Sequence, residues 1–169
     1  MAIRDGLDSD AVAIRAVHLG AFPTSAEADL VERLVAEGDA VISLVAEEKG
    51  EVVGHILLSR MSVCGDGRDY RALGVAPVGV VARGQGRGHG SALIRAALDR
   101  ADALGEEILF LLGSPAYYGR FGFRAEAAAA FASPYAGSHL MALRLHDVPL
   151  PISGRADYAP AFAALEAAS

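Results

Sequence analysis

The 169-residue sequence predicts an α/β fold of the α+β type, with a mixed and mostly antiparallel central sheet flanked by helices. Two β-rich runs, 41–46 and 52–58, are joined by a short polar loop that contains Gly50, which is typical of an antiparallel hairpin. Further along, an apolar run that ends at Ala82 passes through a glycine-rich turn and a helical pattern into the apolar strand 108–112. This order favours a parallel pair. The sequence therefore predicts strand pairs of both orientations.

The other elements follow from apolar spacing and from the residues that begin and end helices. Before the hairpin we expect a strand at 2–4, a helix from Asp8 or Ser9 to about Leu19, and a helix capped by Ser25 and ended by Gly38. After it we expect a loop at 61–70, a long strand at 70–82 broken by Pro77 and Gly79, a helix at about 88–104, a short helical piece at 116–118, helix or loop at 127–130, and a strand near 140–145. The absence of repeats and linkers predicts a single domain over residues 1–169, in which 147–169 form a tail that packs back.

Composition excludes several classes of protein. The formal net charge of −6 disfavours general nucleic-acid binding, which needs a basic face, and no apolar run has the length of a membrane span. The N-terminal residues lack the apolar core of a signal peptide, which predicts a cytoplasmic location. Cys64 is the single cysteine and has no cluster of metal ligands nearby, so we expect no metal and a buried or half-buried structural thiol.

The glycine-rich segment 84–90 predicts a binding site for a pyrophosphate. Its glycines can adopt positive φ values and allow backbone N–H groups to approach an anion, and the helix that follows offers unpaired N–H donors. Arg83 and Arg87 flank these glycines and can supply positive charge, which an acidic chain needs locally in order to bind a polyanion.

Residue spacing separates this turn from other nucleotide-binding turns. A Walker A loop ends in Gly-Lys followed by Ser or Thr, and no lysine lies near this turn. The dinucleotide fingerprint GxGxxG would need a third glycine at His89 if it began at Gly84, or at Ser91 if it began at Gly86. A purely structural turn remains as an alternative, although a chain reversal needs fewer glycines.

Two motifs resemble those of a known family. The segment Gln85-Gly86-Arg87-Gly88-His89-Gly90 resembles the Q/R-x-x-G-x-G/A element of the GCN5-related N-acetyltransferase (GNAT) superfamily, and Val78-Gly79-Val80 resembles its bulged cofactor-binding strand. Downstream, Tyr118 lies four residues before the pair Gly122-Phe123, which is similar to the late motif of the family. The further segments that resemble its YhbS-like subgroup of predicted bacterial acetyltransferases are Gly54-His55 and 158–162.

The resemblance implies an N-acetyltransferase that transfers an acetyl group from acetyl-CoA to a primary amine of a small molecule or protein, by direct attack in a ternary complex. The Val78 N–H would then polarise the thioester carbonyl, and Tyr118 would protonate the leaving thiolate unless it is only a core aromatic residue. The residues implied to bind the cofactor are Val78, Gly79, Val80, Arg83, Gln85, Gly86, Arg87, Gly88, His89, Gly90 and Ser91. Members of this family often dimerise, so the resemblance also implies a homodimer as one option for the oligomeric state.

The sequence leaves the general base open. An alkyl amine with a pKa near about 10 must lose a proton before it can attack. Glu27 and Glu32 on the second helix, His55 in its strand, or a water chain could accept that proton, and His18 and His89 are lower-ranked candidates. These residues also have structural interpretations. Glu27 and Glu32 can be solvated acids on a helix, and His55 can be a half-buried strand histidine bonded to the backbone. The lack of a clear base favours, as an alternative function, a CoA-binding sensor or regulatory module.

Overall fold

The computed structural model describes residues 1–168, and these fall into two compact units that interleave along the chain. The first unit comprises Met1–Ser59, Ala76–Arg100 and Pro160–Ser169, and the second comprises Arg60–Val75 and Ala101–Ala159. Ser169, the last residue of the predicted single domain, lies outside the described residues. Because the two units are compact separately, the single domain stays a prediction.

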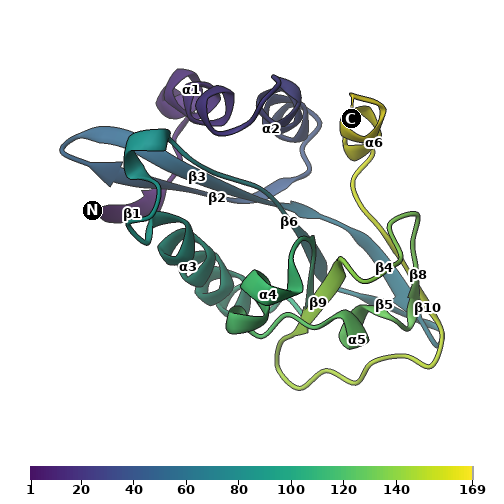
Figure 1. The fold of residues 1–169 in the computed structure, drawn as a ribbon. Coiled ribbons are helices and arrows are strands. Elements are labelled where there is room, and N and C mark those ends of the chain that lie inside the picture. Colours follow the sequence, from purple (N-terminus) through teal and green to yellow (C-terminus); the bar gives the residue numbers. More distant parts are fainter. Residues whose placement is uncertain (169) are drawn as a thin grey trace. The chain divides into compact units, whose positions relative to one another are not determined.

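The described residues form strands, α-helices and short 3₁₀ segments (Figure 1). The strands are β1 Ala2–Asp5, β2 Ala40–Glu48, β3 Glu51–Arg60, β4 Ser62–Gly65, β5 Arg68–Tyr70, β6 Ala72–Val80, β7 Ile108–Leu112, β8 Phe131–Ala132, β9 Leu140–Arg144 and β10 Gly154–Asp157. The α-helices are α1 Ala11–Ala21, α2 Ala26–Ala36, α3 His89–Ala103, α4 Pro115–Tyr118, α5 Ala125–Ala128 and α6 Phe162–Ala168. Short 3₁₀ segments span Asp8–Asp10, Ala82–Gly84 and Gly119–Phe121.

In the first unit, strands support helices on both faces. β1 pairs with β2 and β2 with β3, both in antiparallel orientation, which confirms the predicted hairpin. Its turn consists of Lys49 and Gly50, whose φ values of 53° and 81° suit a two-residue hairpin loop. The C-terminal end of β6 lies beside β3, where the Val81 N–H donates to the Val53 carbonyl at 2.9 Å. Helices α1 and α2 cover one face of β2 and β3, and α3 covers the other (Figure 1).

The helices of the first unit follow the predicted apolar spacing. Helix α2 buries Leu30 and Leu34 on one face and ends before Gly38, whose φ is 80°. Its N-terminus differs in detail from the prediction, because the Ser25 hydroxyl donates to the Asp29 carboxylate at 3.0 Å and caps no backbone N–H. A carboxylate in the first turn still suits the positive end of the helix dipole.

The second unit contains two sets of paired strands: β6, β7 and β9 form one, and β5, β4, β10 and β8 form a separate sheet. The N-terminal half of β6 pairs in parallel with β7, with Ala72 opposite Ile108, and β7 pairs antiparallel with β9. This confirms the predicted parallel pair. The chain therefore has the expected mixed, mostly antiparallel sheet flanked by helices. Strands β5, β4, β10 and β8 form a four-stranded sheet in that order, which was not predicted from the sequence.

The separate sheet corrects two expectations. Residues 61–70, expected as a loop, contain the hairpin β4–β5, because Val63 and Tyr70 face the core of the unit. Burial alternates along β4, which leaves Cys64 exposed, so the expected burial of its thiol is wrong. Within the second unit, Tyr158 is partly buried against the same core, and the packing of the tail as a whole stays a prediction.

None of the helices described within residues 1–168 is long and apolar enough to cross a membrane. The same residues contain no group of three or more His, Cys, Asp or Glu side chains that could hold a metal ion.

Candidate functional site

The turn between β6 and α3 presents backbone donors without internal partners. Gly86 and Gly88 have φ values of 73° and 81°, and a β-carbon on either would meet open space. Within the described part of the chain, the N–H groups of Gly86, Arg87 and Gly88 donate to no other group. Helix α3 begins at the next residue, His89, so its N-terminal dipole is directed at the same turn. Successive free N–H groups at a helix N-terminus fit a pyrophosphate.

The charged side chains of the turn are bound to glutamates from the neighbouring hairpin. Arg83 forms an ion pair with Glu51, and Arg87 forms one with Glu48 at 2.6 Å. The imidazole of His89 is buried and lies 3.3 Å from Glu48. The hydrogen bonds from Arg87 and then His89 lower the pKa of Glu48. The backbone of the turn, rather than its side-chain charge, is therefore its free binding element.

The end of β6 leads directly into this turn. The Ala76–Pro77 peptide is cis, and Val78, Gly79 and Val80 follow it. The Gln85 side chain folds back and donates to the Val80 carbonyl at 2.9 Å, which closes the turn onto the strand. The structure thus brings together, in the first unit, the predicted segments 78–80 and 83–90.

A buried chain of polar side chains lies against this strand. His18 Nε2 lies 2.8 Å from His55 Nδ1, and His55 Nε2 lies 2.9 Å from Ser43 Oγ. Both imidazoles are 0% exposed. Burial lowers the pKa of His18 to about 4 and that of His55 to about 3, so both rings are neutral at pH 7. The expected bond from His55 to the backbone is wrong, because both of its nitrogens contact side chains.

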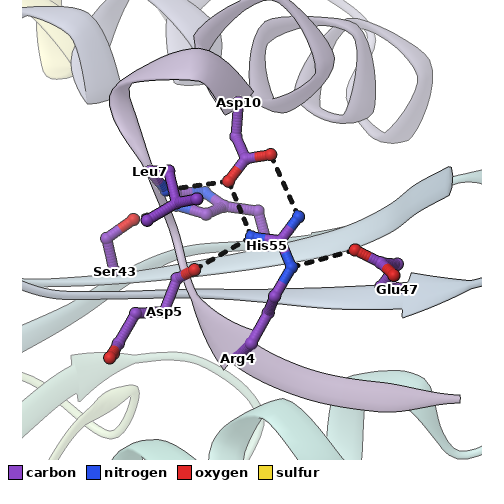
Figure 2. A network of polar contacts seen from close by, with 7 residues as sticks. All are labelled: Arg4, Asp5, Leu7, Asp10, Ser43, Glu47 and His55. Carbon is purple, nitrogen blue, oxygen red and sulfur yellow. Dashed lines mark hydrogen bonds and ion pairs between the residues drawn. The ribbon is translucent and has the colours of Figure 1, made fainter. Parts of the chain in front are cut away.

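An ion-pair network surrounds the outer end of this chain (Figure 2). Arg4 binds Asp10 at 2.8 Å and Glu47 at 2.9 Å, and Asp10 also accepts the Leu7 N–H at 2.8 Å. The hydrogen bond from Arg4, followed by that from Leu7, lowers the pKa of Asp10. The Asp10 charge is therefore held near His55 but is already matched by Arg4.

Tyr118 lies at the end of α4, in the second unit. Pro115 begins this short helix, and the Tyr118 ring contacts those of Phe121 and Phe123 at centroid distances of 6.4 Å. A side chain at Gly113 would collide with the Tyr118 ring. Burial raises the pKa of Tyr118, followed by the effect of Tyr117, so the phenol keeps its proton at neutral pH.

The candidate bases differ in how their polar atoms are bound. Glu32 is exposed and forms an ion pair with Arg15 at 3.1 Å, as a solvated helix residue would. Glu27 has one buried carboxylate oxygen, Oε2, without a hydrogen-bond partner among the described residues. His18 Nδ1 is likewise buried and has no partner there. His18 is a lower-ranked candidate base from the sequence, because no local pattern shows that a helix histidine will contact a strand histidine 37 residues away.

Comparisons with known proteins agree with this arrangement. The profile of the family described as "Acetyltransferase (GNAT) domain" matches residues 2–125. The uncharacterized N-acetyltransferase YjhQ of Escherichia coli is 39% identical over 117 residues, which cover 68% of this chain and 65% of YjhQ. The match thus spans just under two thirds of that relative. The uncharacterized N-acetyltransferase YhbS of Escherichia coli is 36% identical over 73% of each chain.

Solved structures support the same relationship. The crystal structure of Escherichia coli YhbS in complex with CoA superposes with a TM-score of 0.87 at 31% identity, over 96% of this chain and 91% of that one. A GNAT acetyltransferase from Brucella melitensis in complex with acetyl-CoA has a TM-score of 0.78 at 32% identity, over 95% and 97% of the two chains. Because the family profile covers well over half of the sequence and YhbS is similar along most of it, this chain belongs to the GNAT acetyltransferase family.

Proposed function

We propose that the protein is an acetyl-CoA-dependent N-acetyltransferase that acts on a primary amine of a small molecule or protein. The observation that carries the proposal is the turn of free N–H groups at Gly86, Arg87 and Gly88, which fits the pyrophosphate of CoA. The complexes of YhbS with CoA and of the Brucella melitensis enzyme with acetyl-CoA support it.

Acetyl-CoA would supply an acetyl group activated as a thioester. The N–H groups of the turn and of the first residues of α3, including Gly90 and Ser91, would hold the pyrophosphate. The backbone of 78–80 would pair with the amide-bearing arm of the cofactor, as an added strand does. The Val78 N–H would donate to the thioester carbonyl oxygen as negative charge develops there, a role that Pro77 cannot take because it has no N–H.

Tyr118 would give its proton to the departing thiolate. Its half-buried ring is fixed by aromatic neighbours, and its raised pKa keeps the phenol protonated. A thiolate of CoA is of roughly comparable basicity to a phenolate, so the transfer needs little driving force. The acceptor must also lose a proton, for which Glu27, Glu32, His55 or a water chain are the candidates from the sequence. A homodimer remains a prediction.

Incubation with labelled acetyl-CoA tests the activity. The purified protein is mixed with a pool of metabolites and peptides, and the products are read by mass spectrometry. We expect labelled N-acetyl products on primary amines, and none with heat-denatured protein. Tight CoA binding without any labelled product would instead support a sensor or regulatory module.

Substitution in the turn tests the cofactor site separately. Gly88→Val should abolish CoA binding in calorimetry, because a branched residue disfavours a φ of 81° and its side chain would enter the space of the pyrophosphate. Gly38→Val is the matched control, since Gly38 has a φ of 80° with nothing nearby and lies after α2 in the same unit. Gly38→Val should lower the free energy of unfolding by about as much as Gly88→Val does and should leave the affinity for CoA unchanged. Wild-type affinity in Gly88→Val would contradict the proposed site.

A further inference from the structure

His18 presents an unpartnered nitrogen to the strand that we assign to cofactor binding. A β-carbon on Gly79 would lie 2.8 Å from His18 Nδ1 and 3.1 Å from the adjoining ring carbon Cε1, so the ring packs directly against the Gly79 backbone. His18 Nδ1 is buried and has no partner among residues 1–168. Buried polar atoms are rarely left without a hydrogen bond, so this nitrogen is available to a group that binds beside it.

The neutral chain His18–His55–Ser43 can exist in two proton arrangements. In one, His18 Nε2–H donates to His55 Nδ1, His55 Nε2–H donates to Ser43 Oγ, and His18 Nδ1 is a free lone pair. In the other, every donor is reversed and His18 Nδ1 carries a proton with no acceptor. Orphaned buried N–H donors are rarer than incompletely satisfied acceptors, which favours the first arrangement.

We propose that His18, His55 and Ser43 form a proton relay in which His18 is the catalytic base for the acceptor amine. This inference rests on the proposed function. The neighbouring residue of the same strand, Val78, is the proposed donor to the thioester carbonyl, and consecutive Cα atoms lie about 3.8 Å apart. The lone pair of His18 therefore faces the backbone next to the reacting carbonyl. His55 and Ser43 act through His18 and are positioning residues.

The relay balances its protons. The acceptor attacks as the neutral amine, which its ammonium form yields by losing one proton to solvent. As the amine nitrogen bonds to the acetyl carbon and the carbon–sulfur bond breaks, the second proton that the nitrogen must lose to become an amide passes to His18 Nδ1. The Nε2 proton of His18 moves to His55 Nδ1, the Nε2 proton of His55 moves to Ser43 Oγ, and the hydroxyl proton of Ser43 leaves to a solvent base. The departing thiolate takes its proton from the general acid proposed above.

Neither imidazole needs to carry a charge at the end of this sequence, which suits rings that burial keeps neutral. Ser43 is half-buried, whereas both rings are fully buried, so Ser43 is the member of the chain with access to solvent. Asp10 lies near His55, but its carboxylate is bound by Arg4 and Leu7 and is left out of the relay (Figure 2).

The resting proton arrangement can be tested without any substrate. Nitrogen-15 NMR of histidine-labelled protein at pH 7 should show both His18 and His55 as Nε2–H tautomers, with assignments from His18→Gln and His55→Gln. The shift of His18 Nδ1 should be that of a free lone pair. A His18 ring protonated on Nδ1 would overturn the proposed starting state, whatever the activity of the protein.

Kinetics test the transfer itself, with acetyl-CoA and the primary amine that gives the strongest product in the labelling experiment. His18→Gln should lower kcat by about 10²-fold or more with the KM for acetyl-CoA unchanged. Ser43→Ala should lower kcat less, and should convert a curved dependence of rate on D₂O fraction into a linear one, because fewer protons then move together. Ser59→Ala removes another fully buried hydroxyl, from β3, and should match the wild type in both readouts.

A purely structural role for the chain would leave the shape of the D₂O dependence unchanged in Ser43→Ala, and that result would overturn the relay. A kcat of His18→Gln equal to that of the wild type would do the same. If the wild-type protein labels no amine, the proposed function fails instead. The NMR experiment then still tests the proton arrangement of His18 and His55, because it needs no substrate.

Discussion

Gly79 and His18 show how a single missing side chain can set up a site. The sequence marks Gly79 as an interruption of a strand, and the structure gives the reason: any β-carbon there would enter the His18 ring. An irregularity of the strand at Gly79 could be predicted, because a glycine in a strand signals a bulge or the close approach of another group. The group that approaches could not be predicted, since His18 lies 61 residues earlier on a helix whose own pattern indicates only an apolar face.

Tyr118→Phe should lower kcat by about 10²-fold or more, because the variant keeps the ring but cannot protonate the thiolate. Acetyl-CoA affinity should change little. The matched control is Tyr117→Phe, which removes the adjacent phenol and should retain activity. Steady-state kinetics and calorimetry measure the two quantities. Full turnover in Tyr118→Phe would leave Tyr118 with a packing role only.

In the second unit, Glu106 is fully buried and binds Arg60 through two hydrogen bonds of 2.7 Å and Arg71 at 3.1 Å. We expect Arg60→Met to lower the free energy of unfolding by about 3 kcal/mol, because it leaves a buried carboxylate with one partner. Glu106→Gln should cost less, about 1–2 kcal/mol, since the half-exposed arginines can turn to water. Urea denaturation measures both, and the reverse order would contradict this account.

Among the elements, those with a local signal were predicted and those held by distant partners were not. The hairpin β2–β3 and helices α2 and α3 each carry apolar periodicity and a glycine at or beyond their end. The separate sheet consists of strands of two to four residues, too short for a periodic signal. Strands β4 and β10 of this sheet pair across about 90 residues of sequence. The alternation of buried and exposed residues along them can be interpreted only when Val63 and Ala156 are seen to pack into the same core.

Gly154 tests how closely this sheet is packed. A β-carbon there would lie 2.7 Å from the Cys64 backbone carbonyl and 2.8 Å from the Phe131 ring, and a paired strand cannot easily shift to make room. Gly154→Ala should therefore lower the free energy of unfolding by about 1–3 kcal/mol. Ser153→Ala, at the exposed preceding residue, should have little effect in the same denaturation experiment. Equal stability of the two variants would mean that the sheet tolerates a wider spacing.

For the molecule as a whole, the buried histidines should make stability depend on pH. The unfolded chain binds protons on His18 and His55 near pH 6.5, whereas the folded chain does so only near pH 4 and 3. Their stabilising contribution is thus fully present above about pH 6.5 and is lost as the pH falls toward 4. The slope should be up to about 1.4 kcal/mol per pH unit for each histidine. Urea denaturation across this range measures it.

The double variant His18→Gln/His55→Gln should flatten this dependence between about pH 6.5 and 4.5. Asp10 and Glu48, whose pKa values are lowered by their partners, lose their contribution only at more acidic pH. His139→Gln, at an exposed histidine, should leave the slope as in the wild type. A wild-type slope in the double variant would place the proton uptake on other groups.

The sequence by itself determined the fold class, the glycine turn and the family, because these depend on residues that are neighbours along the chain. Strand, turn and helix from Val78 to Ser91 are contiguous, so their motif is readable without a structure. Only the tertiary structure decided that the turn's arginines are bound to Glu48 and Glu51, and that His18, His55 and Ser43 form one buried chain. Those contacts join segments distant in sequence, and the packing of a helix on a sheet fixes which side chains meet.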